Sequence, residues 1–321
     1  MNRTMSPQQR RVQLDGLLIV DKPAGITSHD VVERVRRLSR QRRVGHAGTL
    51  DPLATGVLVL GLGRTTRLLE YMASHDKRYW ATVRLGVSTT TYDAEGEITA
   101  HYEGPWPSLD AVEAALEEFV GEIEQRPPAF SAIKRGGERL YKKARRGEQV
   151  DIAPRRVIVH TLRLMSYVPP TLHLEITCSK GTYIRSLAHD LGQVLGTGAH
   201  LAALRRMASG PFTLDDAHTL EELDTAARAR RLHELLRPPD AGLVNLLAID
   251  ISPEQARRVA HGQPVSGPPP TTPGQMARIR LNGRLLAVAE YDERRGAWQP
   301  RKVFVSVHEV NPAPKRGHTP T

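Results

Sequence analysis

The stretch Gly45-His46-Ala47-Gly48-Thr49-Leu50-Asp51-Pro52-Leu53-Ala54-Thr55-Gly56 decides how this chain is interpreted, because it concentrates flexible residues around a single carboxylate. The density of glycine and proline favours a shaped loop over a regular element. The four apolar residues that follow, 57–60, predict a short buried strand. The sequence therefore predicts a loop that carries Asp51 and leads directly into the core.

Asp51 is the candidate for chemistry in that loop. A residue before proline is biased toward an extended conformation, which can hold the Asp51 carboxylate clear of the backbone. The neighbouring glycines leave room for a substrate to approach closely. Taken alone, the spacing favours the simpler interpretation that Asp51 forms a turn and caps its neighbours. Composition does not decide between the two.

Length and composition indicate a globular protein of two domains. The chain has 321 residues, of which 40% are hydrophobic and 25% charged. Its apolar runs are shorter than the roughly 20 residues a membrane span needs. The first 14 residues carry arginines but no apolar stretch, so we expect no secretory signal and a cytoplasmic protein. The single cysteine, Cys178, excludes an internal disulfide and a multi-cysteine zinc site.

The charge balance points to a polyanionic partner. Lys and Arg number 45 against 35 Asp and Glu, a net charge of +10. A merely basic surface is the alternative, but the charges gather in two clusters, which favours nucleic acid. The first cluster comprises Arg34, Arg36, Arg37, Arg40, Arg42 and Arg43. The second comprises Lys134, Arg135, Arg139, Lys142, Lys143, Arg145 and Arg146.

Periodicity predicts an α+β fold with a mixed, mainly antiparallel sheet. Alternating runs at 79–85, 157–167 and 171–178 predict strands, and apolar spacing predicts helices after Ser28, Ser108 and Thr182. Pro238-Pro239 marks a boundary, after which Asn282-Gly283 between two apolar runs predicts a hairpin. We expect a catalytic-sized domain followed by a small β-rich module.

Several enzyme classes lack their motifs in this sequence. The segment 61–64 has neither the third glycine of a dinucleotide-binding loop nor the lysine of a phosphate-binding loop. No His-Glu-x-x-His or Gly-x-Ser-x-Gly motif is present. We therefore expect no metal and no cofactor.

Motifs along the chain resemble those of the TruB family, the bacterial tRNA pseudouridine-55 synthases. The Asp51 loop with Val57 and Leu58 resembles the family's catalytic signature. Further matches are, in the family's order, Asp21-Lys22-Pro23-Ala24-Gly25-Ile26-Thr27-Ser28, Asp76-Lys77-Arg78-Tyr79, Cys178-Ser179-Lys180-Gly181-Thr182-Tyr183-Ile184-Arg185, Gly198-Ala199-His200-Leu201 and Leu204-Arg205-Arg206. The resemblance covers about residues 14–210.

This resemblance implies the isomerisation of uridine 55 in the T-arm loop of tRNA to pseudouridine, without metal or cofactor. Asp51 matches the nucleophile, which would attack either the ribose C1′ or the uracil C6. Arg185 matches the cation that pairs with it; a solvated helix arginine is the alternative. Tyr79 matches the residue that stacks on the extruded base and is a candidate to assist proton transfer, although a strand tyrosine is more often core.

Other residues are assigned to substrate binding by the same resemblance. Tyr183 and Leu204 match positions that line the pocket, where either could simply pack. His46 would occupy space left in the RNA loop, and Lys22 would meet a phosphate unless it is a solvated lysine. Both basic clusters would bind the tRNA backbone. The residues expected to contact it are Arg34, Arg36, Arg37, Arg40, Arg42, Arg43, Arg135, Arg139, Lys142 and Lys143.

The expected organisation has four parts. Residues 1–14 form a basic disordered arm, 15–238 a pseudouridine synthase catalytic domain, 239–310 a PUA-like RNA-binding module, and 311–321 a disordered tail. We expect a monomer that needs no protein partner and no membrane. Two alternatives remain open: a guide-RNA-dependent pseudouridine synthase subunit, and a non-catalytic tRNA-binding or tRNA-folding factor. The segment 53–56 resembles the stand-alone branch more closely.

Overall fold

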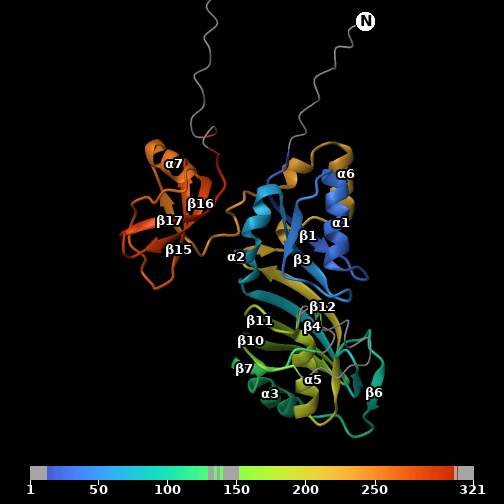
Figure 1. The fold of residues 1–321 in the computed structure, drawn as a ribbon. Coiled ribbons are helices and arrows are strands. Elements are labelled where there is room, and N and C mark those ends of the chain that lie inside the picture. Colours follow the sequence, from blue (N-terminus) through green and yellow to red (C-terminus); the bar gives the residue numbers. More distant parts are fainter. Residues whose placement is uncertain (1–12, 129–133, 136–137, 140–151, 307–308, 310–321) are drawn as a thin grey trace, which may run out of the picture.

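A nine-stranded mixed sheet forms the frame of the protein (Figure 1). The computed structural model describes residues 13–128, 134–135, 138–139, 152–306 and 309. The strand order of the sheet is β1-β3-β12-β4-β11-β10-β7, with β2 paired to β3 and β13 paired to β12. The strands are β1 (Gly16–Lys22), β2 (Val44–Ala47), β3 (Thr55–Leu62), β4 (Lys77–Leu85), β7 (Gly121–Gln125), β10 (Arg155–Val168), β11 (Thr171–Cys178), β12 (Ala199–Ser209) and β13 (Phe212–Thr213).

Helices cover this sheet at both ends. Figure 1 shows α1 and α6 at one end and α3 and α5 at the other. These and the shorter helical segments are α1 (Ser28–Ser39), η1 (Gly63–Leu68), α2 (Leu69–Ala73), α3 (Leu109–Glu117), α5 (Ile184–Val194), η2 (Leu214–Asp216), α6 (Leu220–Arg228) and η3 (Leu232–Leu235). Between β4 and α3 lies the hairpin of β5 (Val87–Thr89) and β6 (Ile98–His101), and β8 (Lys134–Arg135) pairs with β9 (Glu138–Arg139).

The fold depends on one close parallel junction between β3 and β12. Most neighbouring strands run antiparallel, but Thr55 and Gly56 pair in parallel with Arg205 and Arg206. Gly56 has a φ of +99°, and a Cβ there would lie 2.2 Å from the backbone oxygen of Arg206. Only glycine fits this approach without displacing the backbone. The junction fixes the end of the Asp51 loop against β12.

The C-terminal β-rich module is a second sheet with its own core. Its elements are β14 (Leu247–Asp250), α7 (Pro253–Ala260), β15 (Met276–Leu281), β16 (Arg284–Asp292) and β17 (Ala297–Val303). Asn282 and Gly283 both have positive φ, as a two-residue hairpin turn requires, so the predicted hairpin is confirmed. The predicted α+β class, with a mainly antiparallel sheet, is confirmed as well.

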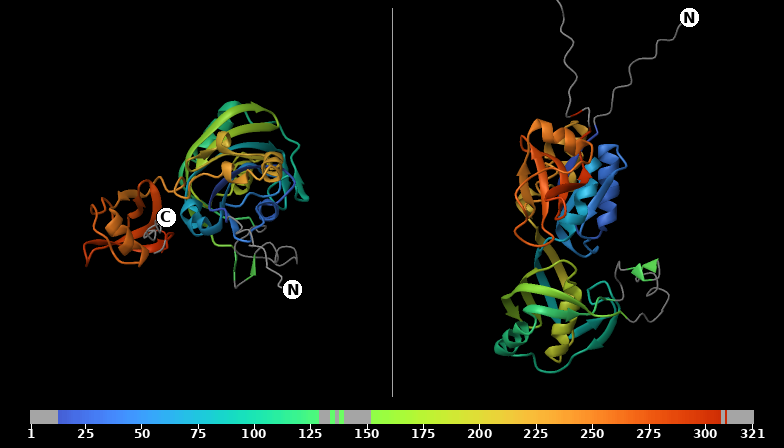
Figure 2. Two further views of the ribbon diagram at one scale, coloured as in Figure 1. Left: turned by 90° about the horizontal axis from the view of Figure 1, so that it is seen from above. Right: turned by 60° about the vertical axis from the view of Figure 1, so that its left-hand side comes forward.

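This module packs against the first half of the large sheet (Figure 2). Leu285, Val288 and Phe304 share one buried cluster with Leu17 and Val59. Arg67 donates to the carbonyl of Val303 (2.8 Å), and the Lys302 ammonium donates to the carbonyl of Arg67 (2.7 Å). Apolar burial and polar contacts therefore join the two units.

Some local predictions need correction. The helix expected after Ser28 begins at Ser28 itself, because Thr27 caps α1 in a reciprocal pair of hydrogen bonds with Asp30. The stretch 45–56 is not loop throughout, because β2 takes its first residues and β3 its last two. Within the described residues, no helix is long and apolar enough to span a membrane. The predicted basic arm (except residues 13–14) and the C-terminal tail lie outside the described residues.

Candidate active site

A pocket of about 260 Å³ lies where the Asp51 loop, β4, β12 and the start of α5 meet. Five residues assigned from the sequence line it together: Asp51, Tyr79, Tyr183, Arg185 and Leu204. They come from segments up to 153 positions apart in the chain, the separation between Asp51 and Leu204. The fold therefore gathers the three predicted catalytic residues and two of the predicted substrate-binding residues at one place.

Contacts from outside hold the Asp51 loop in shape. The Ser28 hydroxyl donates to the carbonyl of Leu50 (3.0 Å) and accepts from its amide (2.8 Å). The carbonyl of Pro52 accepts from the amide of Gly25 (2.9 Å). Leu50 is buried and anchors the loop in the core. Asp51 thus lies between two fixed residues, with 41% of its side chain exposed to the pocket.

Lys22 is part of this support and does not lie at the surface. Its ammonium donates to the carbonyls of Pro23 (2.8 Å), Ile26 (2.6 Å) and Pro52 (3.4 Å), and the residue is fully buried. Burial lowers the pKa of Lys22 to about 8. The expected phosphate contact does not fit this placement, because all three N–H donors already have backbone acceptors. Lys22 instead braces the residue that follows Asp51.

Arg185 faces Asp51 from the first turn of α5. Its Nε lies 3.0 Å from Oδ2 of Asp51, and its side chain is only 6% exposed. The start of α5 is held by Gln125, whose side-chain amide accepts from the amide of Tyr183 (2.7 Å) and donates to its carbonyl (3.0 Å). Gln125, at the end of β7, therefore fixes the start of α5 and with it the position from which the Arg185 side chain extends.

A second carboxylate, Asp93, binds the same guanidinium. Nη1 of Arg185 lies 3.3 Å from Oδ2 of Asp93 and donates to the carbonyl of Thr91 (3.1 Å). The other oxygen of Asp93 accepts from the Thr91 hydroxyl and from the amide of Glu95 (3.1 Å). The Asp93 side chain is 4% exposed, so this ion pair is shielded from solvent.

Two opposing effects set the protonation of Asp51. Desolvation by the packed atoms around the carboxyl raises its pKa, and the Arg185 guanidinium lowers it. The negative charge of Asp93 raises the pKa of Asp51 further, and the net result is a value above the ordinary one. The ionised form that a nucleophile needs therefore depends on Arg185.

Arg206 is a buried cation that also lines the pocket. It is 1% exposed, and it donates to the carbonyls of Val57 (2.6 Å) and Gly48 (3.0 Å). It lies beside Tyr79, whose pKa is raised by burial and lowered in part by Arg206. Tyr79 is buried in β4 and offers a neutral phenol ring to the pocket.

The pocket lining includes a second aromatic ring, that of Tyr183. The guanidinium of Arg155 lies over the ring of Tyr183, 4.6 Å from its centroid, and donates to the carbonyl of Gly181. Leu204 of β12 adds an apolar contact. His46, on β2, does not line this pocket; burial and the nearby Arg206 lower its pKa.

The first basic cluster divides into paired and open arginines. Arg34 pairs with Asp224 of α6, and Arg36 pairs with Glu33 and donates to the carbonyl of Val44. Arg37, Arg40, Arg42 and Arg43 are exposed. In the second cluster, Lys142 and Lys143 lie outside the described residues, and of Arg135 and Arg139 only the backbone strands are described. The open arginines of the first cluster are therefore the ones available for a polyanion.

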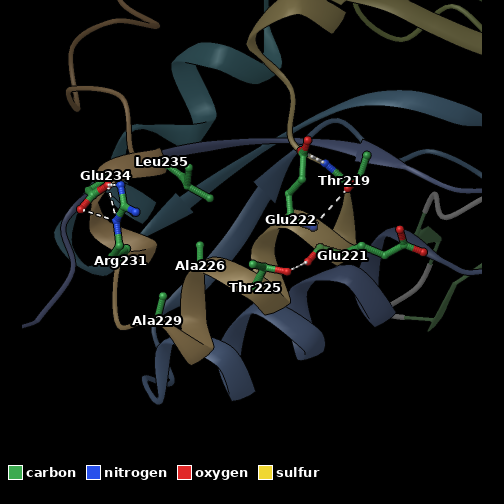
Figure 3. Close-up of a pocket in the computed structure, with 9 residues that line it drawn as sticks. All are labelled: Thr219, Glu221, Glu222, Thr225, Ala226, Ala229, Arg231, Glu234 and Leu235. Atoms are coloured by element: carbon green, nitrogen blue, oxygen red, sulfur yellow. Dashed lines mark hydrogen bonds and ion pairs between the residues drawn. The ribbon is translucent and has the colours of Figure 1, made fainter.

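A larger hollow, of about 630 Å³, lies between α6 and η3 (Figure 3). Its lining includes Glu221, Glu222 and Glu234, and Figure 3 shows Glu234 paired with Arg231. An acidic lining repels phosphate groups, so this hollow does not fit nucleic acid.

Sequence reasoning did not assign roles to Asp93 and Arg206. Asp93 lies in Thr89-Thr90-Thr91-Tyr92-Asp93, a run of hydroxyl residues typical of a tight turn around a carboxylate. Arg206 stands next to Arg205 in a strand, where alternation places it on the buried face. A charged residue on the buried face of a strand is unusual, and this pattern indicates a functional or structural role for Arg206.

Comparison with known proteins agrees with this geometry. The model of the TruB family pseudouridylate synthase N-terminal domain matches residues 36–184, and that of the tRNA pseudouridylate synthase B C-terminal domain matches 185–244. A protein named tRNA pseudouridine synthase B from Thermobifida fusca is 47% identical over 298 residues, 90% of this chain and 98% of that protein. The chain belongs to the TruB family.

Another TruB-family relative, from Dehalococcoides mccartyi, is 41% identical over 94% of this chain and 99% of its own length. Among solved structures, the Cbf5–Nop10–Gar1 complex contains a chain that matches with a TM-score of 0.74 and 26% identity, covering 95% of this chain and 89% of that one. The archaeal box H/ACA Nop10–Cbf5 complex gives a TM-score of 0.72 and 26% identity, covering 95% and 90%. This TruB-family chain is thus a pseudouridine synthase, which isomerises uridine to pseudouridine.

Proposed function

We propose that the protein converts uridine 55 in the T-arm loop of tRNA to pseudouridine, with Asp51 as the nucleophile. The observation that carries this proposal is the Asp51 carboxylate, exposed to the pocket and 3.0 Å from the guanidinium of Arg185. The relatives that match over nine tenths of the chain are named for tRNA, which supports that substrate.

The reaction breaks the N1–C1′ bond of uridine, forms a C5–C1′ bond, and moves a proton from C5 to N1. Asp51 attacks either C1′ of the ribose or C6 of the uracil, and its carboxylate then departs as a leaving group. Arg185 keeps that carboxylate ionised against the effect of desolvation. No metal or cofactor takes part in this scheme.

The target base must leave its stack before Asp51 can reach it. Extrusion costs a few kcal/mol, and stacking on an aromatic ring recovers about 1–3 kcal/mol of that. Tyr79, in the pocket wall, is the ring we assign to stacking, and Tyr183 and Leu204 complete the lining. The raised pKa of Tyr79 favours its phenol form, so Tyr79 can take a proton from the base only if its own phenol proton passes to another group in the same step.

The tRNA backbone would lie across the exposed arginines of the first cluster, Arg37, Arg40, Arg42 and Arg43. We assign residues 239–310 to a PUA-like RNA-binding module that extends this surface. His46, at the end of β2, would fill the space that the extruded base leaves. The enzyme would act as a monomer in the cytoplasm, without a protein partner.

One assay, run under two conditions, tests this proposal. The purified chain is given an unmodified T-arm minihelix labelled with tritium at C5 of uridine, and release of tritium is followed. Release from the single uridine at position 55, without added protein or guide RNA, is expected. The Cbf5 structures favour a guide-dependent subunit as the second candidate, and that candidate predicts no release until guide RNA and partner proteins are added.

A further inference from the structure

Tyr92 adopts a backbone conformation that its side chain disfavours. Its φ is +63°, in the left-handed region, where the Cβ of a non-glycine residue crowds the following carbonyl. Tyr92 lies in the turn between β5 and β6, directly before Asp93. A residue held this way indicates that surrounding contacts compensate for the strain.

The compensating contact is an aromatic stack on α5. The rings of Tyr92 and His189 lie parallel, with centroids 3.8 Å apart and an interplanar angle of 11°. Burial lowers the pKa of His189, which favours the neutral ring. His189 follows Arg185 by four residues, so both side chains lie on the same face of the helix.

The residues on either side of Tyr92 contact Arg185. The carbonyl of Thr91 accepts from Nη1 of Arg185 (3.1 Å), and Oδ2 of Asp93 lies 3.3 Å from the same atom. Three consecutive residues of the turn therefore contact two positions, one helical turn apart, on α5. Arg185 and His189 share one rigid element.

Backbone bonds hold the other side of the turn. The amide of Leu201 donates to the carbonyl of Tyr92 (3.0 Å), and the amide of Ala94 donates to the carbonyl of Leu201 (3.0 Å). These bonds attach the turn to β12, not to α5. The stack is thus a contact that sets the distance between the turn and α5 independently of the guanidinium.

We propose that the Tyr92–His189 stack is a positioning device for Arg185: it clamps the turn onto α5 so that Asp93 and the Thr91 carbonyl hold the guanidinium against Asp51. This inference rests on the proposed function, in which Arg185 keeps the nucleophile ionised. Tyr92 and His189 are not among the pocket-lining residues, so the effect that we assign to them is indirect.

Four variants test the stack by single-turnover tritium release and by equilibrium binding of the same T-arm RNA. Tyr92→Asn removes the ring but keeps a residue that tolerates positive φ, and His189→Ala removes the partner ring. Each is expected to slow turnover about 10- to 100-fold, as misplaced catalytic groups do, with the Kd for RNA changed less than twofold. Tyr92→Phe and His189→Phe keep two stacked rings and are expected to retain the rate within twofold.

Coupling to Asp93 separates positioning from general damage. If the stack acts through Asp93 and Arg185, adding Tyr92→Asn to Asp93→Asn is expected to slow turnover by less than the product of the two single effects. Tyr102→Ala, which removes a ring from the Tyr102–Trp106 pair outside the pocket, is the matched control and retains the rate. Circular dichroism measures the folded fraction of each variant, and each rate is normalised to that fraction.

Unchanged turnover in both Tyr92→Asn and His189→Ala, full multiplicativity with Asp93→Asn, or loss of rate in both phenylalanine variants would each overturn the inference. None of these results bears on the assignment of Asp51 as the nucleophile. Failure of the proposed function is read separately, from turnover by Asp51→Asn.

Discussion

Nε of Arg185 lies 3.0 Å from Oδ2 of Asp51, and this pair joins the first turn of α5 to the loop before β3. The same guanidinium contacts Asp93 through Nη1 at 3.3 Å. A guanidinium fixed by two carboxylates has little freedom to turn away, since its planar fork presents donors in set directions. The geometry therefore ties the ionisation of Asp51 to a cation whose orientation Asp93 controls.

Asp93→Asn is expected to lower the single-turnover rate about 10- to 100-fold, because the guanidinium loses a shielded ionic partner and its alignment with Asp51. RNA affinity is expected to change little, because Asp93 does not line the pocket. Tritium release under single-turnover conditions measures the rate, and filter binding measures affinity.

Glu95→Gln is the matched control for that variant. Glu95 is an exposed carboxylate two residues away; its backbone amide donates to Asp93, and its side chain acts on Asp51 and Arg185 through its charge. We expect it to retain most of the rate. Equal losses in the two variants would show that total negative charge matters here, and not the contact with Arg185.

Asp51→Asn is expected to leave the protein at least as stable as the original chain at pH 7. The folded-state pKa of Asp51 is raised, so folding disfavours the ionised carboxyl, and that penalty is fully present above the folded-state pKa. The penalty vanishes below the unfolded value near 3.8, where both states are protonated. Thermal melting at pH 7 and near pH 3.5 measures the difference, and a marked loss of stability confined to pH 7 would contradict the assigned direction.

Binding of tRNA is expected to weaken with salt, through the exposed arginines of the first cluster. Arg37→Ala and Arg42→Ala should each reduce the slope of log K against log salt by about 0.7–0.9, the contribution of one phosphate contact. Arg34→Ala should reduce it less, because Arg34 is already paired with Asp224. Equal slopes for all three variants and the original chain would show that these arginines do not contact the tRNA backbone.

Gly56→Ala is expected to destabilise the fold by roughly 3 kcal/mol or more, because the new Cβ meets the Arg206 backbone oxygen at 2.2 Å and the backbone must move. Gly121→Ala is the control. Gly121 has a φ of +96° but open space around its Cβ position, so only the conformational cost of about 1 kcal/mol applies. Urea denaturation gives both values, and similar losses would show that strain alone, without the close approach, accounts for Gly56.

Local sequence patterns predicted the elements but not their contacts. Alternation placed Tyr79 on a strand and Asn282-Gly283 in a hairpin because these features depend on neighbours in the chain. The motifs assigned Asp51 and Arg185 to one site, but no spacing rule places residues 134 positions apart at 3.0 Å (185 − 51). That distance depends on how β7 holds α5 and how β12 meets β3.

Lys22 shows most clearly what the sequence alone does not predict. As a sequence feature it is a lysine between an apolar strand and a proline, which fits a phosphate contact as well as a brace. The structure buries it completely and directs its ammonium to three carbonyls. The local patterns around Asp93 and Arg206 indicate a turn carboxylate and a charge on a buried strand face, but the roles of both residues depend on partners from distant segments.

The most direct measurement is single-turnover tritium release from a T-arm minihelix by Asp51→Asn, with Asp110→Asn, a carboxylate of α3 outside the pocket, as control. The asparagine side chain matches the carboxylate in shape but has no charge with which to attack carbon. We expect no release above background from Asp51→Asn, binding of the RNA within a few-fold of the original chain, and full release from Asp110→Asn. Release at the original rate by folded Asp51→Asn would contradict the account.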